Sequence, residues 1–257
     1  MKSLSQEKIA QIGEIYSECN SLRETCRRLN ISIGSAHKYT TQLNIVNTQN
    51  IVNELKSCDQ RLIGLYIGLW MGDGTQYYDE GYTVKICSNK KNVLLNKFIQ
   101  ESIFRLFGKN TRLEYEKSRN NAYIRFESKF IFNFVYKYIS RGESKTHTVR
   151  LREDIEAYSV DFLEGCLLGL ILTDGYLKRI LSFSITSSGL ADNLDNILKK
   201  FVFHPYRYID RREQYTLGQI YIVKLSPFES RTLRLLLDNV LKKLDCKNTF
   251  QELKYEK

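Results

Sequence analysis

The feature that most limits how this chain can fold is an internal repeat. Residues 62–75 read LIGLYIGLWMGDGT, and residues 162–176 read FLEGCLLGLILTDGY. When their Asp-Gly pairs are aligned, small residues fall in register at every fourth position of both segments. These small residues are Gly64, Gly68 and Gly72 in the first segment and Gly165, Gly169 and Thr173 in the second. A repeated segment of this kind predicts two structurally equivalent halves.

The segments that follow the two motifs also repeat, in the order of the elements that their apolar periodicity predicts. In the first half these are a strand at 82–88, a helix at 91–107, strands at 111–117 and 122–127, and a helix at 129–139. In the second half they are a strand at 181–187, a helix at 190–201, strands at 206–212 and 219–225, and a helix at 228–244. With one further short strand after each motif, each half has the order α-β-β-α-β-β-α. The chain is then an internal pseudo-dimer.

The small residues indicate how the two halves meet. Residues four apart lie on one face of a helix, so each motif helix has one nearly bare side. Two bare sides allow helix axes to approach more closely than the usual separation of about 8–10 Å. We therefore expect an interface between the motif helices at the centre of the pseudo-dimer. Its contact residues are Gly64, Gly68, Gly165 and Gly169.

Each motif helix ends on an acid, Asp73 or Asp174, followed by a glycine suited to a left-handed helix stop. A helix C-terminus disfavours negative charge by about 0.3–1 kcal/mol, and close packing brings the two carboxylates together. Such a pair repels unless a cation or proton lies between. A hard divalent cation suits these oxygen ligands, to which the carbonyls of Gly72 and Thr173 can be added. A lone Asp-Gly pair commonly marks only a turn, but two in register favour a site.

The first 45 residues predict helices alone, at 5–17, 22–29 and 33–43, with a short turn at 30–32. Two short helices joined by such a turn are typical of a helix-turn-helix domain that binds DNA. Its third helix and the turn before it would expose Ser32, Ser35, His37, Lys38 and Thr41 to DNA. The alternative is a plain three-helix unit that contacts protein. The predicted domains are 1–45, a linker at 46–58, and the two halves at 59–150 and 151–257.

Charge favours a polyanionic partner. The chain has 39 Lys and Arg against 29 Asp and Glu, a net charge of +10, and most of the surplus lies after residue 57. Such a balance favours nucleic acid before membrane. Strand alternation assigns Val84 and Ile86 to the core and leaves Thr83 and Lys85 facing outward. The candidate DNA contacts are Lys38, Lys85, Arg112, Lys117, Arg125, Arg207, Arg211 and Lys224. The alternative for each is an ordinary solvated side chain.

Other classes of protein fit poorly. No apolar run approaches the ~18–20 residues that span a bilayer, and the first residues lack the apolar core of a secretion signal. The six cysteines form no Cys-x-x-Cys pair and the three histidines stand far apart, so neither a zinc site nor a disulfide framework is expected. We expect an intracellular protein, cytoplasmic or nucleoid-associated, without a membrane partner.

The segments GLWMGDG and GLILTDG resemble the two signature motifs of the LAGLIDADG (DOD-type) homing endonuclease family, in its single-chain, two-motif form. The resemblance covers about residues 60–250. It implies an α+β monomer whose two saddle-shaped antiparallel sheets lie in the major groove of double-stranded DNA. It also implies that Asp73 and Asp174 bind the catalytic Mg²⁺ (or Mn²⁺), and that both strands are hydrolysed to leave short 3′ overhangs.

The sequence departs from the family pattern at two points. Met71 and Leu172 replace an earlier acidic residue of the motif, at a position that is variable in the family and does not bind metal. The basic or amide residue that the family places close to each carboxylate corresponds by position to Asn89 or Lys90 in the first half and to Lys178 in the second. The resemblance thus implies that Asp73, Asp174, Lys90 and Lys178 are catalytic.

Three functions remain open on this basis. The first is a site-specific endonuclease, intron-encoded or free-standing, to which the helix-turn-helix adds contacts beyond the cleavage site. The second is a regulator that binds DNA on the same fold without cutting it. The third is an RNA-splicing maturase. Retention of both aspartates favours the first, because a scaffold needs no acids at packed helix ends.

Overall fold

The computed structural model describes residues 5–19, 22–42, 59–78, 81–116, 119–210 and 219–255. The chain divides into two compact units, Met1–Ser57 and Cys58–Lys257, which we describe separately. The predicted linker at 46–58 and the domain boundary at residue 45 lie outside the described residues, as do two of the candidate DNA contacts, Lys117 and Arg211.

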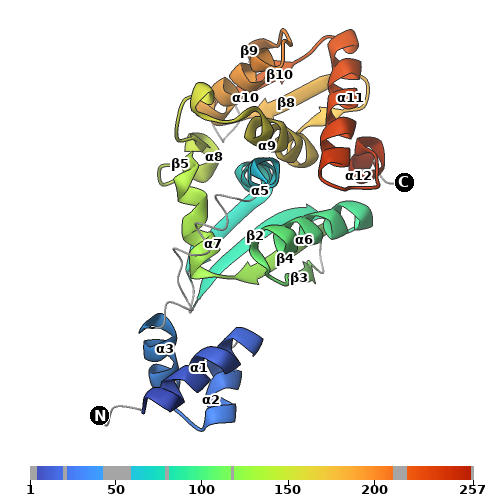
Figure 1. Ribbon diagram of the computed structural model, residues 1–257. Helices are drawn as coiled ribbons and strands as arrows, with labels where there is room; N and C mark the ends of the chain where they lie inside the picture. The colour runs from blue at the N-terminus through green and yellow to red at the C-terminus, as the bar shows by residue number, and fades with distance from the viewer. Residues whose placement is uncertain are drawn as a thin grey trace. The chain divides into compact units, whose positions relative to one another are not determined.

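The first unit consists of three helices in its described part. They are α1 (Gln6–Cys19), α2 (Leu22–Leu29) and α3 (Ile33–Gln42) (Figure 1). Ile12, Ala36 and Tyr39 are buried and form the core where the three helices pack on one another. Asn30 takes the left-handed conformation (φ 50°) between α2 and α3, and the Ser32 hydroxyl accepts a hydrogen bond from the backbone N–H of Ser35 (3.2 Å) at the start of α3. The three predicted helices are confirmed, although α1 continues to Cys19, past its predicted end at residue 17, and the predicted end of the third helix at residue 43 lies outside the described residues.

The second unit contains the two predicted halves. The first half comprises α5 (Gln60–Asp73), β1 (Gly74–Tyr78), β2 (Tyr82–Asn89), α6 (Val93–Phe107), β3 (Arg112–Tyr115), β4 (Asn121–Glu127) and α7 (Lys129–Phe134). The second comprises α9 (Val160–Thr173), β7 (Tyr176–Leu177), β8 (Leu181–Ile185), α10 (Ser188–Lys200), β9 (Tyr206–Asp210), β10 (Ile220–Lys224) and α11 (Pro227–Lys243). Strands β1 and β7 are the expected extra strands, so the order α-β-β-α-β-β-α is confirmed.

Short elements connect and close the halves. They are the 3₁₀ turn Val135–Lys137, β5 (Ile139–Ser140), α8 (Lys145–Thr148), β6 (Arg150–Leu151), the 3₁₀ turn Ile155–Ala157, and α12 (Phe250–Tyr255) at the C-terminal end. Helix α7 is shorter than predicted because the chain tightens into the 3₁₀ turn and then pairs as β5 with β6. No described helix is both long and apolar enough to cross a membrane.

The two sheets have the same antiparallel topology. Their strand orders are β1-β2-β4-β3 and β7-β8-β10-β9, which match strand for strand under the repeat. In the first sheet Val84 and Ile86 are fully buried, where α6 and α7 pack on β2. Thr83 is also buried, although alternation predicted an outward position. Each half is thus an antiparallel sheet with helices on one face and an open opposite face.

Helices α5 and α9 lie side by side at the centre of the unit (Figure 1). Asp59 caps α5 by accepting a hydrogen bond from the Arg61 backbone N–H (2.9 Å), and Ser159 caps α9 in the same way. A Cβ at Gly64 would overlap the carbonyl oxygen of Phe162, and one at Gly165 would overlap that of Arg61. A Cβ at Gly68 would likewise overlap the carbonyl oxygen of Cys166, and one at Gly169 would overlap that of Leu65. The helices therefore touch backbone to backbone along both glycine faces.

A buried ionic cluster joins the halves near the start of these helices. The Arg61 guanidinium donates to Glu164 (2.7 Å) and to Asp161, and Lys243 of α11 donates to both oxygens of Glu164 (2.9 and 3.0 Å). Arg61 and Glu164 are both buried. Breaking such a pair by removing one partner leaves an uncompensated charge, so the cluster favours a single alignment of α5 on α9.

Candidate active site

The paired helices bring Asp73 and Asp174 together at their C-terminal ends. A Cβ at Gly72 would lie 3.1 Å from Oδ2 of Asp174, so the second carboxylate reaches the last turn of α5. The glycine after each acid does not take the predicted left-handed conformation: Gly74 is extended (φ −79°). Glycine is required there for space, since a Cβ would lie 2.6 Å from Cα of Trp70. The equivalent Gly175 is as close to Ile171 (2.7 Å).

The two carboxylates are electrostatically coupled. Burial and then the charge of Asp73 raise the pKa of Asp174 to about 6, against the opposing effect of two lysines. Burial likewise raises the pKa of Asp73. The Asp174 side chain is open to solvent on one side, but the surrounding protein still removes much of the water that would stabilise its charge. The pair therefore favours an additional cation or proton.

The two lysines are Lys145 of α8 and Lys254 of α12. The ammonium of Lys145 donates to the carbonyls of Gly72 (2.8 Å) and Gly74 (2.5 Å). That of Lys254 donates to the carbonyls of Leu172 (2.6 Å) and Thr173 (2.8 Å). Each lysine thus caps the C-terminus of one central helix, where positive charge is stabilising. Burial lowers the pKa of each lysine to about 8, and the two aspartates partly oppose that effect.

These contacts change the expected metal ligands. The carbonyls of Gly72 and Thr173 were expected to be open to a cation, but each accepts a hydrogen bond from an ammonium group. The Thr173 hydroxyl is directed back along its own helix and donates to the Gly169 carbonyl (3.0 Å). A metal ion bound to the same carbonyl oxygen would be repelled by the ammonium group that the oxygen already accepts from. Only the carboxylates of Asp73 and Asp174 therefore remain as candidate metal ligands.

The two carboxylates suit a hard divalent cation whose remaining ligands come from other molecules. Among the described residues, no three His, Cys, Asp or Glu side chains gather to form an all-protein metal cage. Mg²⁺ is commonly held by one or two carboxylates together with phosphate oxygens and water. Two carboxylates of raised pKa, balanced in charge by two lysines, fit that description.

Lys145 and Lys254 were missed by the sequence reasoning, which placed the basic residues at Lys90 and Lys178. Lys90 is exposed in the turn after β2, where its backbone N–H donates to the Asn120 carbonyl (2.8 Å). Lys178 is exposed, and its ammonium lies 5.5 Å from the ring centre of Tyr255. The lysines whose charges lower the pKa values of both aspartates are Lys145 and Lys254. The available signal was that Lys145 and Lys254 each follow the closing helix of their half.

A hollow of about 290 Å³ opens beside Asp73. Its wall includes Cys87 and Asn89 of β2, Asn121 of β4, and Lys254. The hollow therefore leads from the carboxylate to the end of the first sheet, and it is lined by groups that can hydrogen-bond a polar ligand.

The open face of the first sheet carries a polar row across all four strands. Pairing places Thr75, Lys85, Arg125 and Arg112 side by side. Acidic neighbours partly neutralise this row: Glu114 lies 3.9 Å from the Lys85 ammonium and 3.4 Å from the Arg125 guanidinium. Donors and acceptors alternating in this way suit hydrogen bonding to base edges.

The open face of the second sheet is rich in hydroxyl groups. Lys224 donates to the Tyr208 hydroxyl (2.8 Å), and the rings of Tyr206 and Tyr208 are nearly parallel. Arg207, a predicted DNA contact, lies on the other face of β9, where its guanidinium pairs with Asp192 of α10. We therefore no longer assign Arg207 to the open face. In the first unit, the predicted contact Lys38 is exposed on α3, with its ammonium 5.3 Å from the Tyr39 ring centre.

Comparisons with known proteins identify the fold. No family model and no curated protein matches the chain. Among solved structures, the complex of I-DmoI with DNA and Mn has a TM-score of 0.53 at 15% identity, covering 70% of this chain and 97% of that one. The complex with DNA and Ca has the same TM-score at 17% identity, covering 70% and 91%. I-DmoI is a homing endonuclease. The chain has the LAGLIDADG fold.

The N-terminal LAGLIDADG domain of DUF199/WhiA is also similar, with a TM-score of 0.48 at 14% identity, covering 77% of this chain and 95% of that one. At this distance a match carries no information beyond the fold. The repeated motifs, the strand order and the paired helices described above are the LAGLIDADG arrangement of this chain.

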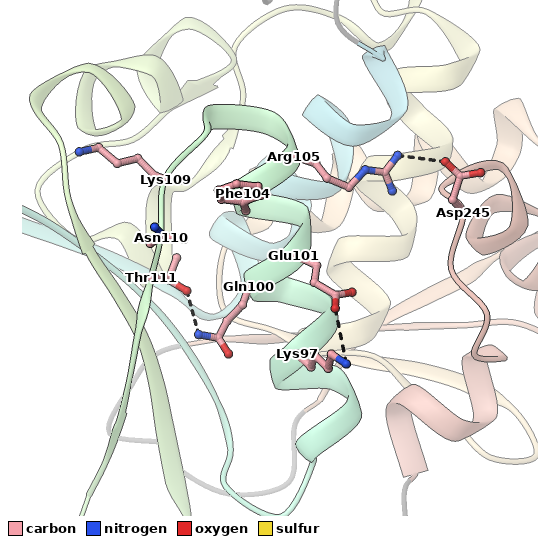
Figure 2. Close-up of a pocket in the computed structure, with 9 residues that line it drawn as sticks. All are labelled: Lys97, Gln100, Glu101, Phe104, Arg105, Lys109, Asn110, Thr111 and Asp245. Carbon is pink, nitrogen blue, oxygen red and sulfur yellow. Dashed lines mark hydrogen bonds and ion pairs between the residues drawn. The ribbon is translucent and has the colours of Figure 1, made fainter. Parts of the chain in front are cut away.

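A second hollow of the LAGLIDADG unit lies away from the carboxylates. It has a volume of about 670 Å³ and is bounded by α6, residues 109–111 and Asp245 (Figure 2). Its polar groups pair with one another: Arg105 with Asp245 (3.3 Å), Lys97 with Glu101 (3.8 Å), and Gln100 with Thr111 (2.9 Å) (Figure 2). Because these groups satisfy each other, we assign no chemistry to this hollow.

The raised pKa of Asp174 predicts a stability effect in the absence of metal. A raised pKa means that the folded state disfavours the charge, so stability falls as pH rises from about 4 to about 6. Asp174→Asn removes this cost at pH 7. A pKa shift of this size lowers the free energy of unfolding by at most about 3 kcal/mol. Because the Asp174 side chain is open to solvent on one side, we reduce this cost to about 1 kcal/mol. In EDTA we expect the Asp174→Asn protein to have a Tm about 2–4 °C above that of the wild type at pH 7, and the same Tm as the wild type at pH 4.

Thermal unfolding at the two pH values measures this effect. Asp154→Asn, at an exposed acid without a side-chain cap bond, is the matched control and should leave Tm unchanged at both. A loss of stability in Asp174→Asn at pH 7 would show that the carboxylate is already well satisfied without metal.

Proposed function

We propose that this protein is a divalent-metal-dependent endonuclease that hydrolyses both strands of double-stranded DNA. The observation that carries the proposal is the meeting of Asp73 and Asp174, each beside a capping lysine, between two sheets with polar open faces. The DNA complexes of I-DmoI with Mn and Ca support this function for the fold.

In this proposal Asp73 and Asp174 hold Mg²⁺ or Mn²⁺. When bound, the cation lowers the pKa of a water and stabilises the leaving 3′-oxygen. The protein contributes a fixed pair of carboxylates, whose approach is enforced by glycine contacts along α5 and α9. Their raised pKa values increase the gain from binding a cation, because the cation relieves the cost of charging both acids.

Lys145 and Lys254 stabilise charge on the scissile phosphates. Two protons of each ammonium are directed at helix-end carbonyls, which fixes the nitrogen and leaves the third proton for a phosphate oxygen. With a pKa of about 8, each lysine is mostly protonated at pH 7. Preorganised cations of this kind stabilise a transition state without reorganisation.

The open sheet faces supply DNA contact in this proposal. Lys85, Arg112 and Arg125 of the first sheet, and Lys224 with its tyrosine neighbours of the second, lie on these faces. The three-helix unit, with Lys38 exposed on α3, adds a second DNA contact as a helix-turn-helix. The coupled carboxylates favour cutting over a regulator that only binds, because two neighbouring acids of raised pKa cost stability that a scaffold has no reason to bear.

Substitution of the capping lysines is expected to slow cleavage without abolishing DNA binding. Lys145→Met and Lys254→Met should each lower the single-turnover rate by about 10²-fold, the usual cost of removing one preorganised charge-stabilising group. Lys90→Met and Lys178→Met are the matched controls at exposed lysines and should change the rate by less than about threefold. If the controls lose more activity than the Lys145 and Lys254 variants, the sequence-based assignment is the correct one.

The proposed function is tested by recovering a duplex that the full chain binds from a random library, then incubating it with Mg²⁺. We expect cuts in both strands a few bases apart, no cuts in EDTA, and a footprint that extends beyond the cut on one side. Binding without cutting in both Mg²⁺ and Mn²⁺ would instead support a regulator. Selective recovery of RNA would support a maturase.

A further inference from the structure

The surroundings of the two capping lysines differ, although each caps the C-terminus of one motif helix. The Lys145 ammonium lies 4.8 Å from the ring centre of Trp70, on the last turn of α5. The guanidinium of Arg141 lies 5.8 Å from the same ring. Two cations thus lie against one buried indole, three residues before Asp73.

Arg141 is held in a fixed orientation. Its Nε and Nη2 both donate to the Tyr136 hydroxyl (3.1 and 2.6 Å), and its guanidinium lies 5.4 Å from the Tyr136 ring centre. No described residue accepts a hydrogen bond from Nη1 of Arg141, and the side chain is only half-buried. An oriented guanidinium with donors to spare is suited to bidentate recognition of a phosphate.

Among the described residues of the second half, the positions that we compare hold no group equivalent to Arg141. The residue four before Lys254 is Phe250, the first residue of α12, and it is fully buried. The position of Trp70 is taken by Ile171, also fully buried. Two other cations of the second half lie near Tyr255: Lys178, which is exposed over its ring, and Arg234, whose Nη2 donates to the carbonyls of Leu177 and Lys178. The two sides therefore differ in that only the first has a guanidinium held against the indole beside its capping lysine.

We propose that Arg141 binds the phosphate at one of the two scissile positions only, so that the two DNA strands are cut at unequal rates. This inference rests on the proposed endonuclease function. Arg141 adds a charge-assisted contact to one phosphate in the transition state, while the other phosphate is contacted by its capping lysine without such help. Wild-type protein should accumulate a nicked intermediate in which the Arg141-side strand is cut first.

The test follows each strand of the selected duplex separately, with the full chain in Mg²⁺ under single-turnover conditions. Arg141→Ala should slow cleavage of one strand by about 30–100-fold and of the other by less than about threefold, reversing the order of nicking. Lys178→Ala is the matched control and should slow neither strand by more than about threefold. Equal slowing of both strands by Arg141→Ala, or slowing of neither, would overturn the proposal.

A second variant separates this role from a folding defect. Tyr136→Phe keeps the ring and removes the hydroxyl that orients Arg141, so it should slow the same strand selectively. Arg141→Lys retains the charge but not the planar fork and should restore only part of the rate. A Tyr136→Phe protein with wild-type strand rates would contradict the orienting contact.

A binding measurement keeps the proposal testable without cleavage. In Ca²⁺, each phosphate in the central part of the selected duplex is replaced in turn by an uncharged methylphosphonate. At one position on one strand the replacement should weaken wild-type binding by about tenfold and cost Arg141→Ala protein little. Equal penalties in the two proteins at every position would refute the Arg141 contact. Failure of the wild type to cut any duplex would instead count against the endonuclease function, and the binding comparison would still decide for or against Arg141.

Discussion

Asp73→Asn and Asp174→Asn are each expected to lower DNA cleavage by at least about 10³-fold while leaving DNA affinity within about threefold of wild type. Asparagine keeps the shape of the side chain but loses the charge that holds a divalent cation. Binding should persist because contacts to many other phosphates supply most of the affinity. The double variant should be no slower than either single variant if the two acids act as a unit.

Strand-resolved cleavage in Mg²⁺ and mobility shift in Ca²⁺ measure the two effects separately. Asp154→Asn, at an exposed acid outside the site, should behave as wild type in both. Retained double-strand cleavage by either active-site variant would show that the paired carboxylates are not the metal ligands. Loss of DNA binding in step with cleavage would show that the variants disturb the fold.

The largest expected effect on stability comes from Gly64→Ala. The added methyl group would overlap the Phe162 carbonyl oxygen and lie 2.9 Å from the Cys166 nitrogen. Both atoms belong to the backbone of α9, so no side chain can move aside and the two helices must separate. Separation opens voids along a fully buried interface, for which we expect a loss of at least about 4 kcal/mol, the range of severe core substitutions.

Urea unfolding of the full chain measures this loss. Gly81→Ala is the matched control in the same unit, since a Cβ there meets nothing closer than 3.7 Å, and it should change stability by less than about 1 kcal/mol. A Gly64→Ala protein that unfolds at the wild-type urea concentration would mean that α5 and α9 do not touch along their glycines.

The repeat made the fold predictable from the sequence. Small residues at every fourth position gave the central helix pair, and the alternation of strand residues gave the order of each half, because one face of every element is buried. Details set by tertiary contact were less predictable. Thr83 is buried although its face is open, and Arg207 pairs with Asp192 on the helix side of its sheet. Gly74 is required by Trp70 rather than by a positive φ.

The candidate site was predictable only in its carboxylates. Asp73 and Asp174 lie within the repeated motifs, so their meeting follows from the packing of those motifs. Lys145 and Lys254 lie in short helices far along the chain from the carbonyls they cap, and the sequence marks them only by their place after the closing helix of each half. Their role depends on where the closing segment of each half returns, which is a property of the folded chain.

The most direct test of the account is Mn²⁺ binding, followed by electron paramagnetic resonance of the free ion, with the selected duplex present. The account predicts that wild-type protein withdraws Mn²⁺ from solution and that the Asp73→Asn, Asp174→Asn double variant, bound to the same duplex, withdraws no more than the duplex alone. Equal uptake of Mn²⁺ by the two proteins would contradict it, since the metal would then be held by other groups.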